Sequence, residues 1–234
     1  GHLERIGGFT DIPMEKILGM DQPFHYRNKA QFPVGKSKDG RIITGFYAGR
    51  THSIIENRDC ALGVTRNKEV LDRVIAHMEK FHIQPYDENT GKGVVRHVLI
   101  RYGFFTDEMM VCLIINGENL PGEEALVKSL RQIPEAVSVM VNVNKKRNNV
   151  ILGEKVRLLW GQPYITDKIG EISYQISPLS FVQVNPYQTG RLYGKALEYA
   201  QLSGNETVWD LYCGIGTISL FLAQKAKMVR GVEI

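Results

Sequence analysis

An acidic residue and two glycines stand together near the end of the sequence. Asp210 closes an apolar run that starts at Thr207, and Gly214 and Gly216 follow at the spacing D-x-x-x-G-x-G. Glycine in such a turn lets the backbone bend sharply and lets a ligand approach closely, because it has no Cβ. Glu233 ends the next apolar run and is suited to accept hydrogen bonds from two ribose hydroxyls. These residues predict a nucleotide-cofactor site.

The elements around these residues follow the order strand, turn, helix and strand. The run 207–211 is apolar, 218–223 has apolar residues at helical spacing, and 228–233 predicts a second strand. The unit is βαβ, with free backbone N–H groups at the start of its helix. A dinucleotide fingerprint requires a third glycine where Ser219 stands, which disfavours an NAD-linked oxidoreductase. The spacing instead resembles the first motif of S-adenosylmethionine-dependent methyltransferases; from these residues alone, a turn of some other α/β domain is the alternative.

A segment further upstream makes the resemblance more specific. The run Phe181-Val182-Gln183-Val184-Asn185 precedes a helix-period segment and is followed by the D-L-Y-C-G run at Asp210 and by V-E-I at the end of the chain. In combination these segments resemble the RumA/TrmA family of RNA uracil-C5 methyltransferases. The resemblance also covers 24–35 and 52–60, and therefore most of the chain. It points to the bacterial ribosomal-RNA branch, the RlmD/RlmCD-like enzymes.

The resemblance implies roles for individual residues. Gln183 matches the family's cofactor-contacting glutamine, and Phe181 matches the aromatic residue that lies against the target uracil. From residue type alone, Phe181 is equally compatible with a core position at a strand end. Thr217 stands where many members carry asparagine. The implied cofactor site comprises Gln183, Asp210, Tyr212, Gly214, Gly216, Thr217 and Glu233, and the expected substrate-binding residues are Phe181, Arg27 and Lys29.

The resemblance also implies where the catalytic residues lie. In the family a cysteine thiolate adds to C6 of uracil, C5 then attacks the sulfonium methyl group, and a carboxylate base removes the C5 proton. The motifs that carry this cysteine and this base would follow Ile234. We therefore expect a sequence truncated at both ends relative to the family, with no catalytic residue among its 234 positions and no methyl transfer by this chain. Cys213 is expected to be a small buried residue of the cofactor loop.

The chain has three cysteines, Cys60, Cys112 and Cys213, without paired spacing. A disulfide framework is not predicted, and without a signal peptide or a long apolar run the sequence predicts a cytoplasmic protein. Cys112 alternates within an apolar run and is expected in a strand core. The resemblance places Cys60 where relatives carry the fourth ligand of a [4Fe–4S] cluster, whose other three ligands form an N-terminal cysteine cluster missing here. We interpret Cys60 as a vestigial ligand. A [4Fe–4S] cluster is an alternative for the parent protein, and we do not expect one in this chain.

Basic residues are concentrated in one part of a chain whose net charge is +4. Between Phe24 and Arg58 there are seven Lys or Arg residues and two acids, so that the local charge is +5. Such a stretch can follow a phosphate backbone, and a solvated hairpin face explains the charge equally well. The run 145–147, Lys-Lys-Arg, has the same two interpretations.

The hydrophobic pattern predicts an α/β protein in two parts. We expect a mixed α+β central domain over 1–178, followed at 179–234 by the incomplete first βαβ unit of a Rossmann-like methyltransferase domain, with the boundary at Pro178. Hydrophobic residues make up 43% of the chain, enough for such a core. The predicted strands are 27–34, 41–48, 95–105, 109–115, 137–143, 156–160 and 170–176, and the predicted helices follow Thr65, Pro121 and Asn185.

Two classes of function follow from these observations. The first is a 23S rRNA (uracil-C5)-methyltransferase that forms 5-methyluridine, with tRNA as the alternative substrate. The second is a noncatalytic RNA-binding module, since the basic hairpin is present while the expected catalytic residues are not. Both predict RNA as the partner and no membrane association.

Overall fold

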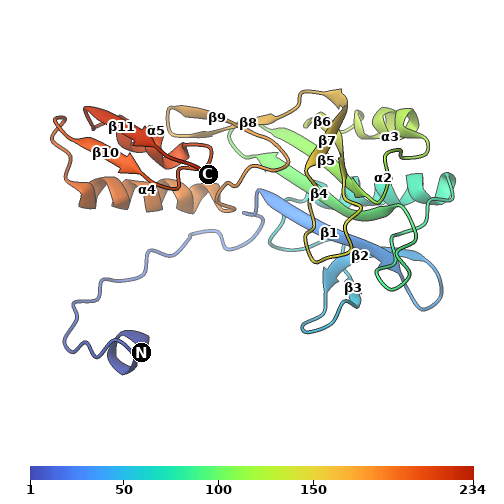
Figure 1. Cartoon of the computed structure of the whole chain (residues 1–234), viewed down its shortest axis with the longest axis horizontal. Helices are drawn as coiled ribbons and strands as arrows, with labels where there is room; N and C mark the ends of the chain where they lie inside the picture. Colours follow the sequence, from blue (N-terminus) through green and yellow to red (C-terminus); the bar gives the residue numbers. More distant parts are fainter.

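The computed structural model describes residues 1–234, which form eleven strands and five helices. The strands are β1 (Lys29–Lys36), β2 (Ile42–Tyr47), β3 (Ile54–Glu56), β4 (Val95–Gly103), β5 (Glu108–Ile115), β6 (Ala136–Val143), β7 (Lys155–Gly161), β8 (Ile165–Ile169), β9 (Ile172–Ile176), β10 (Thr207–Asp210) and β11 (Met228–Gly231). The helices are α1 (His2–Arg5), α2 (Arg66–Lys80), α3 (Glu123–Leu130), α4 (Pro186–Ala200) and α5 (Thr217–Ala223). Figure 1 shows a large lobe around β1–β7 and a smaller lobe around α4 and α5, with the β8–β9 hairpin next to both.

The large lobe is built on one seven-stranded sheet. Its strand order is β3-β2-β1-β4-β5-β6-β7, and every neighbouring pair is antiparallel except β5 and β6, which are parallel and connected through α3. Helices α2 and α3 bury their apolar sides against one face of this sheet, through residues such as Leu71, Met78 and Leu126. Each fully buried side chain of this size contributes about 1.5–3 kcal/mol of hydrophobic free energy.

Strand β5 lies in the middle of the sheet and is buried on both faces. Successive side chains of a strand point to opposite faces, so its continuous apolar run supplies two separate clusters. This explains why the run shows no alternation of apolar and polar residues. The side chains facing α2 and α3 are Met109, Val111, Leu113 and Ile115, and those on the other face are Met110, Cys112 and Ile114.

The second face of the sheet is covered by the β8–β9 hairpin. Strand β8 contacts β4 and β5, and α4 and α5 in turn contact this hairpin. A single apolar cluster therefore connects Leu99 of the large sheet, Tyr174 of β9, and Val182 and Tyr193 further along the chain, with Phe221 of α5 packed against it. The predicted boundary at Pro178 lies inside the stretch of chain that contributes to this shared cluster.

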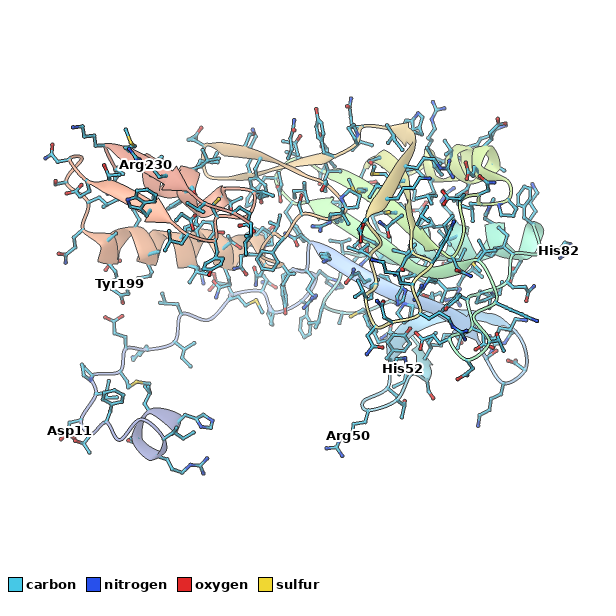
Figure 2. The ribbon with its side chains drawn as sticks, in the orientation of Figure 1. Asp11, Arg50, His52, His82, Tyr199 and Arg230 are labelled. Atoms are coloured by element: carbon cyan, nitrogen blue, oxygen red, sulfur yellow. The ribbon has the colours of Figure 1, made fainter.

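The smaller lobe contains the predicted βαβ unit. Strands β10 and β11 pair in parallel, with Trp209 opposite Arg230, and α5 connects them. The guanidinium of Arg230 lies over the ring of Trp209, 5.2 Å from its centroid (Figure 2). Helix α4 begins at Pro186, which has no N–H to lose at a helix start. The side chain of Asn185 caps this helix by accepting a hydrogen bond of 3.1 Å from the amide of Gln188.

Residues 15–21 contact α4, and the chain before them, which includes the short helix α1, extends away from the rest of the molecule (Figure 1). The side chain of Gln188 donates to the carbonyl of Leu18 at 2.8 Å, and Arg191 forms an ion pair of 2.5 Å with Asp21. Apolar side chains of this segment are exposed, among them Ile17 at 95%. The segment is therefore held by polar contacts to one helix and adds little to the core.

Most predicted elements are present, with small shifts at their ends, and two strands are new. The helix after Thr65 ends at Lys80, and the strand predicted over 95–105 ends at Gly103. Strands β3 and β8, of three and five residues, were not predicted from the sequence. Both are short, and each forms only against a neighbouring strand, so that neither carries a local hydrophobic period of sufficient length.

Candidate functional site

The glycine loop between β10 and α5 is fixed by backbone hydrogen bonds. The amide of Val232 donates to the carbonyl of Asp210 at 2.8 Å, and the amide of Cys213 donates to the carbonyl of Val232 at 3.1 Å. Gly214 and Gly216 have φ values of 54° and 83°, which side chains with a Cβ rarely adopt. A Cβ added at either glycine would meet no atom within 4 Å. The space above the loop is therefore open, as a ligand lying against this backbone requires.

Asp210 and Ser219 are joined across the first turn of α5. The hydroxyl of Ser219 donates to a carboxylate oxygen of Asp210 at 2.6 Å. The residue that breaks the dinucleotide fingerprint thus has a positive role, because it orients the acid at the end of β10. A glycine or alanine at position 219 could not make this bond.

Glu233 reaches back to the glycine loop. One of its carboxylate oxygens accepts a hydrogen bond of 2.7 Å from the amide of Gly214. The carboxylate is exposed, so its second oxygen can accept from a ligand. The fold thus brings Gly214 and Glu233 into contact, although they are nineteen positions apart. Both residues were predicted to belong to one site.

The other residues of the loop have different environments. Tyr212 is 79% exposed, whereas Thr217 is buried and its hydroxyl lies 3.0 Å from the hydroxyl of Tyr193 on α4. Cys213 is half-buried, which corrects the expectation of a fully buried residue. Its sulfur would lie 2.9 Å from a Cβ at position 231, so that Gly231 allows the loop to pack closely against β11.

The segment that carries Phe181 and Gln183 is attached to the large sheet by its backbone. The buried side chain of Asn28 donates to the carbonyl of Gln183 at 3.0 Å, and the amide of Asn28 donates to the carbonyl of Val184 at 3.0 Å. Arg101, which is 2% exposed, donates to the carbonyl of Pro178 at 3.1 Å and also to that of Ser180. The chain is thus fixed on both sides of Phe181.

Phe181 is not a core residue, because 74% of its surface is exposed. Gln183 lines a cavity of about 350 Å³ between α4 and the N-terminal segment, together with Leu18 and Arg191. No hydrogen bond joins Gln183 to the glycine loop: its carbonyl is bonded to Asn28. The structure therefore brings Glu233 to Gly214 but does not bring the side chain of Gln183 to either of them.

Positive charge gathers at the start of β1. Burial lowers the pKa of Lys29, and the nearby charges of Arg101 and Arg27 lower it further. No carboxylate is among the groups that shift this pKa. Three cationic groups therefore lie near one another, and Lys29 has no acidic partner to neutralise it. An anionic ligand would relieve this repulsion.

Cys60 lies in a turn between β3 and α2. It is half-buried, and its carbonyl accepts a hydrogen bond of 3.0 Å from the amide of Gly63. The structure has no group of three or more His, Cys, Asp or Glu side chains arranged to hold a metal ion. The other two cysteines lie in β5 and in the glycine loop, and they are not partners of Cys60.

Sequence reasoning missed three residues that shape the site: Asn28, Arg101 and Tyr193. Arg101 had a signal, because it is one of two arginines, with Arg96, that stand within the largely apolar run of β4 at positions that must be buried. Asn28 lies within the motif run 24–35 but received no role. The contact of Tyr193 with Thr217 joins two helices and has no local signature in the sequence.

Comparison with known proteins relates the whole chain to RNA methyltransferases. No model of a known protein family matches the chain. An uncharacterized RNA methyltransferase of Halalkalibacterium halodurans is 50% identical over 99% of the chain and 51% of its own length, and one of Bacillus cereus is 49% identical over 99% of the chain and 50% of its own length. The chain spans about half the length of the curated relatives it matches.

A solved structure has a similar fold. The crystal structure of Pyrococcus abyssi tRNA (uracil-54, C5)-methyltransferase in complex with S-adenosyl-L-homocysteine aligns with a TM-score of 0.75 and 26% identity, over 91% of this chain and 50% of that one. The mixed α/β fold with its large sheet is therefore similar to that of an S-adenosylmethionine-dependent methyltransferase. With the relatives above, this match confirms the predicted relationship of the chain to the RumA/TrmA family of RNA methyltransferases. None of the five helices is long and apolar enough to cross a membrane.

Proposed function

We propose that these 234 residues are the RNA-facing part and the first βαβ unit of an S-adenosylmethionine-dependent 23S rRNA (uracil-C5)-methyltransferase. The observation that carries the proposal is the hydrogen bond between Glu233 and the amide of Gly214, which holds an exposed carboxylate beside an open glycine loop. The RNA methyltransferase relatives and the uracil-C5 methyltransferase bound to S-adenosyl-L-homocysteine support the class of reaction. In this proposal the methyltransferase domain begins at 179, and its start packs on the RNA-facing sheet.

The residues around the glycine loop fit the proposed cofactor. S-adenosylmethionine supplies a methyl group that its sulfonium makes electrophilic. Glu233 has a carboxylate oxygen available to accept from a ribose hydroxyl, while its other oxygen stays on the amide of Gly214. Asp210 is oriented by Ser219, and Tyr212 offers an exposed aromatic ring beside the loop. The chain's contribution is to bind and orient the cofactor.

Gln183 and Thr217 are assigned to the same cofactor site. Thr217 is buried and bonded to Tyr193, so its contribution is to hold the start of α5 rather than to reach the ligand with its hydroxyl. Gln183 lines the cavity beside α4 and makes no hydrogen bond to the glycine loop, so its contact with the cofactor would form only when the ligand binds. We therefore propose that the glycine loop and Glu233 contact the cofactor in their present positions, and that Gln183 contacts it after its side chain moves.

The substrate side of the site is formed by Phe181, Arg27 and Lys29. An exposed aromatic ring on a fixed backbone offers a surface on which a base stacks. Lys29 lies near Arg27 and Arg101 without a neutralising acid, which suits a backbone phosphate. A uracil against Phe181 and a phosphate at Lys29 are consistent with single-stranded RNA, whose bases are accessible.

The three cysteines of the chain do not supply the nucleophile. Burial raises the pKa of Cys112 to about 12, so that its thiolate is not formed at neutral pH. Cys213 packs against Gly231 within the cofactor loop, and Cys60 lies in the turn after β3. We infer that these 234 residues bind cofactor and RNA but do not by themselves carry out the covalent addition to uracil.

A second candidate substrate is tRNA. The specific observation in its favour is the solved neighbour, which is named as acting on uracil-54 of tRNA. The cationic group at β1 and the exposed Phe181 serve either RNA equally, since both contacts read the backbone and the face of a base. The choice between the two RNAs is therefore a matter for experiment.

The test is methyl transfer by the complete gene product. The enzyme is incubated with S-adenosylmethionine labelled in its methyl group and with unmodified 23S rRNA or tRNA, and nucleosides are analysed by mass spectrometry. We expect labelled 5-methyluridine from 23S rRNA. Label in tRNA alone supports the second substrate, and RNA binding without label in either RNA would show a noncatalytic RNA-binding module. The 234-residue chain alone is expected to give no labelled nucleoside.

A further inference from the structure

Aromatic side chains gather between the β4–β5 turn and the start of α4. The ring of Tyr187 lies 5.7 Å from that of Phe104 and 5.8 Å from that of Phe105, both nearly edge to face. Phe104 in turn lies 5.3 Å from Tyr102. Tyr187 is 55% exposed and Phe105 is 50% exposed. Two segments far apart in the sequence thus form one exposed cluster of aromatic rings. Exposed apolar patches of this kind often mark a binding site.

This cluster forms one wall of a cavity of about 680 Å³. A volume of this size is within the usual range of roughly 300–1,000 Å³ for small-molecule sites. The other walls come from the turn around His25 and from the start of α2. Its lining includes His25, Arg66, Tyr102, Phe104, Asp107 and Tyr187.

The polar groups at the cavity offer acceptors. His25 has its Nδ1 2.8 Å from the carbonyl of Gly63, and because a carbonyl only accepts, Nδ1 carries the proton. In the neutral ring Nε2 is then an acceptor. One oxygen of Asp107 accepts from the hydroxyl of Tyr102 at 2.6 Å, which leaves the other oxygen available.

The cavity has no cation available for a phosphate. Arg66 is its only basic residue apart from His25, and it is bonded to Glu69 at 3.0 Å and to Glu135 at 2.9 Å. Both carboxylates also line the cavity, so its charge opposes an anion. The cavity instead suits a nucleic-acid base: its aromatic rings can stack on the face of the base, and its acceptors can receive a hydrogen bond from an amino group of the base.

The cavity and the proposed uracil site are connected through the backbone. Tyr187 lies six positions after Phe181 in the same segment of chain. The amide of Tyr102 donates to the carbonyl of Asn28 at 2.9 Å, and Asn28 also holds the carbonyl of Gln183. A nucleotide next to the one at Phe181 would therefore meet this second aromatic surface.

We propose that the cavity lined by Phe104, Tyr187 and His25 binds a purine base of single-stranded RNA close to the target uridine. The inference rests on the proposed function and adds to it a specificity-determining contact. A purine presents the larger π-face for stacking. The amino group of adenine or guanine can donate to Nε2 of His25 or to Asp107, whereas uracil has no amino group.

The test measures RNA binding by the purified protein and by three variants. The probe is a short single-stranded RNA with one uridine and a 2-aminopurine directly before or after it, whose fluorescence is quenched when the base stacks. Tyr187→Ala is expected to weaken binding by about tenfold or more and to lose the quenching, because one stacked base is removed. Tyr187→Phe keeps the ring and is expected to behave like the wild type.

The matched control is Tyr199→Ala. Tyr199 is on the same helix, is 65% exposed and lies at the far end of α4 (Figure 2). Its loss is expected to change neither affinity nor quenching. Equal losses at Tyr187 and Tyr199 would overturn the inference, and so would unchanged binding by Tyr187→Ala. An RNA with an abasic site in place of the purine is expected to bind the wild type as weakly as the normal RNA binds Tyr187→Ala.

The outcomes separate this inference from the proposed function. Tight RNA binding by the wild type together with unchanged binding by Tyr187→Ala would remove the purine site and leave the methyltransferase proposal intact. No RNA binding by the wild type would contradict both. The thermal unfolding midpoint of each variant is measured as a control. A midpoint equal to that of the wild type shows that a loss of affinity comes from the missing ring and not from misfolding.

Discussion

At the scale of single residues, the proposed cofactor site depends on the hydrogen bond that the amide of Gly214 donates to Glu233. This bond holds an exposed carboxylate beside the glycine loop, although the two residues are nineteen positions apart. Sequence spacing predicted both residues as parts of a cofactor site, but it could not show that the acid contacts the loop itself.

Replacing this carboxylate by an amide tests its role. Glu233→Gln keeps the size of the side chain and removes the charge that strengthens hydrogen bonds to the ribose and to the amide of Gly214. We expect the affinity for S-adenosyl-L-homocysteine, measured by calorimetry, to fall by about tenfold. Glu198→Gln, which changes an exposed acid of α4, is the matched control and should leave the affinity unchanged. Equal affinities of Glu233→Gln and wild type would remove Glu233 from the site.

A buried histidine makes stability depend on pH. Burial lowers the pKa of His97 from 6.5 to about 4, so the folded state keeps this ring neutral. Its folded pKa lies below its unfolded pKa, and the unfolded chain therefore takes up the proton first as the pH falls. We expect the free energy of unfolding to drop by roughly 2 kcal/mol between pH 7 and pH 5 on account of this group.

Urea unfolding at the two pH values checks this expectation. The His97→Leu protein should lose most of this pH dependence. The part that remains is expected from His77, because burial lowers the pKa of this histidine as well. His2→Gln, a change at an exposed position, should retain the full dependence. A His97→Leu protein whose stability falls as steeply as that of the wild type would show that another group is responsible.

At the scale of elements, the site depends on how β1 and β4 hold the segment between β9 and α4. Asn28 at the start of β1 and Arg101 in β4 bond to the backbone on both sides of Phe181. Arg101 is buried without an acid partner, and burial lowers its pKa to about 10. A charged group is therefore kept in the interior at a cost in stability, and its carbonyl contacts keep Phe181 outside the core.

Removing the tether from β1 should loosen this segment. Asn28→Ala leaves the carbonyl of Gln183 without its partner, and we expect it to lower the free energy of unfolding by about 1–2 kcal/mol. It should also weaken RNA binding, because Phe181 is no longer fixed. Asn205→Ala, in an exposed turn, is the control for stability. Urea denaturation showing the same midpoint for Asn28→Ala and wild type would contradict the tethering role.

The long elements could be predicted from the sequence, and the connections between them could not. The helix after Thr65 and the two strands around 95–115 carry long hydrophobic periods, which are determined locally. Strand β8 has five residues, and its place on the sheet is determined by contacts with β4 and β5. The positions of Asn28 and Arg101 at the site depend on the same long-range packing, so their roles became visible only in three dimensions.

At the scale of the whole molecule, ion pairs distinguish the basic residues that are neutralised by nearby acids from those that remain available for the proposed contact with RNA. In the run 145–147, Lys145 is paired with Glu118 and Lys146 with Glu154, and Arg147 donates to a backbone carbonyl. This run is therefore largely neutralised by its own surroundings. Lys29 instead lies near two arginines and no acid, and one of them, Arg101, donates to the carbonyl of Ser180, the residue before Phe181. In the proposed function, this cationic group and Phe181 contact the same RNA.

The central claim is that this chain is part of an enzyme that methylates C5 of a uridine in 23S rRNA. The most direct test is mass-spectrometric mapping of 5-methyluridine in 23S rRNA and tRNA from a strain that lacks the gene, and from the same strain complemented with it. We predict that deletion removes 5-methyluridine from 23S rRNA, that tRNA keeps it, and that complementation with wild type, but not with Glu233→Gln, restores it fully. Unchanged 5-methyluridine in the 23S rRNA of the deletion strain would contradict the claim.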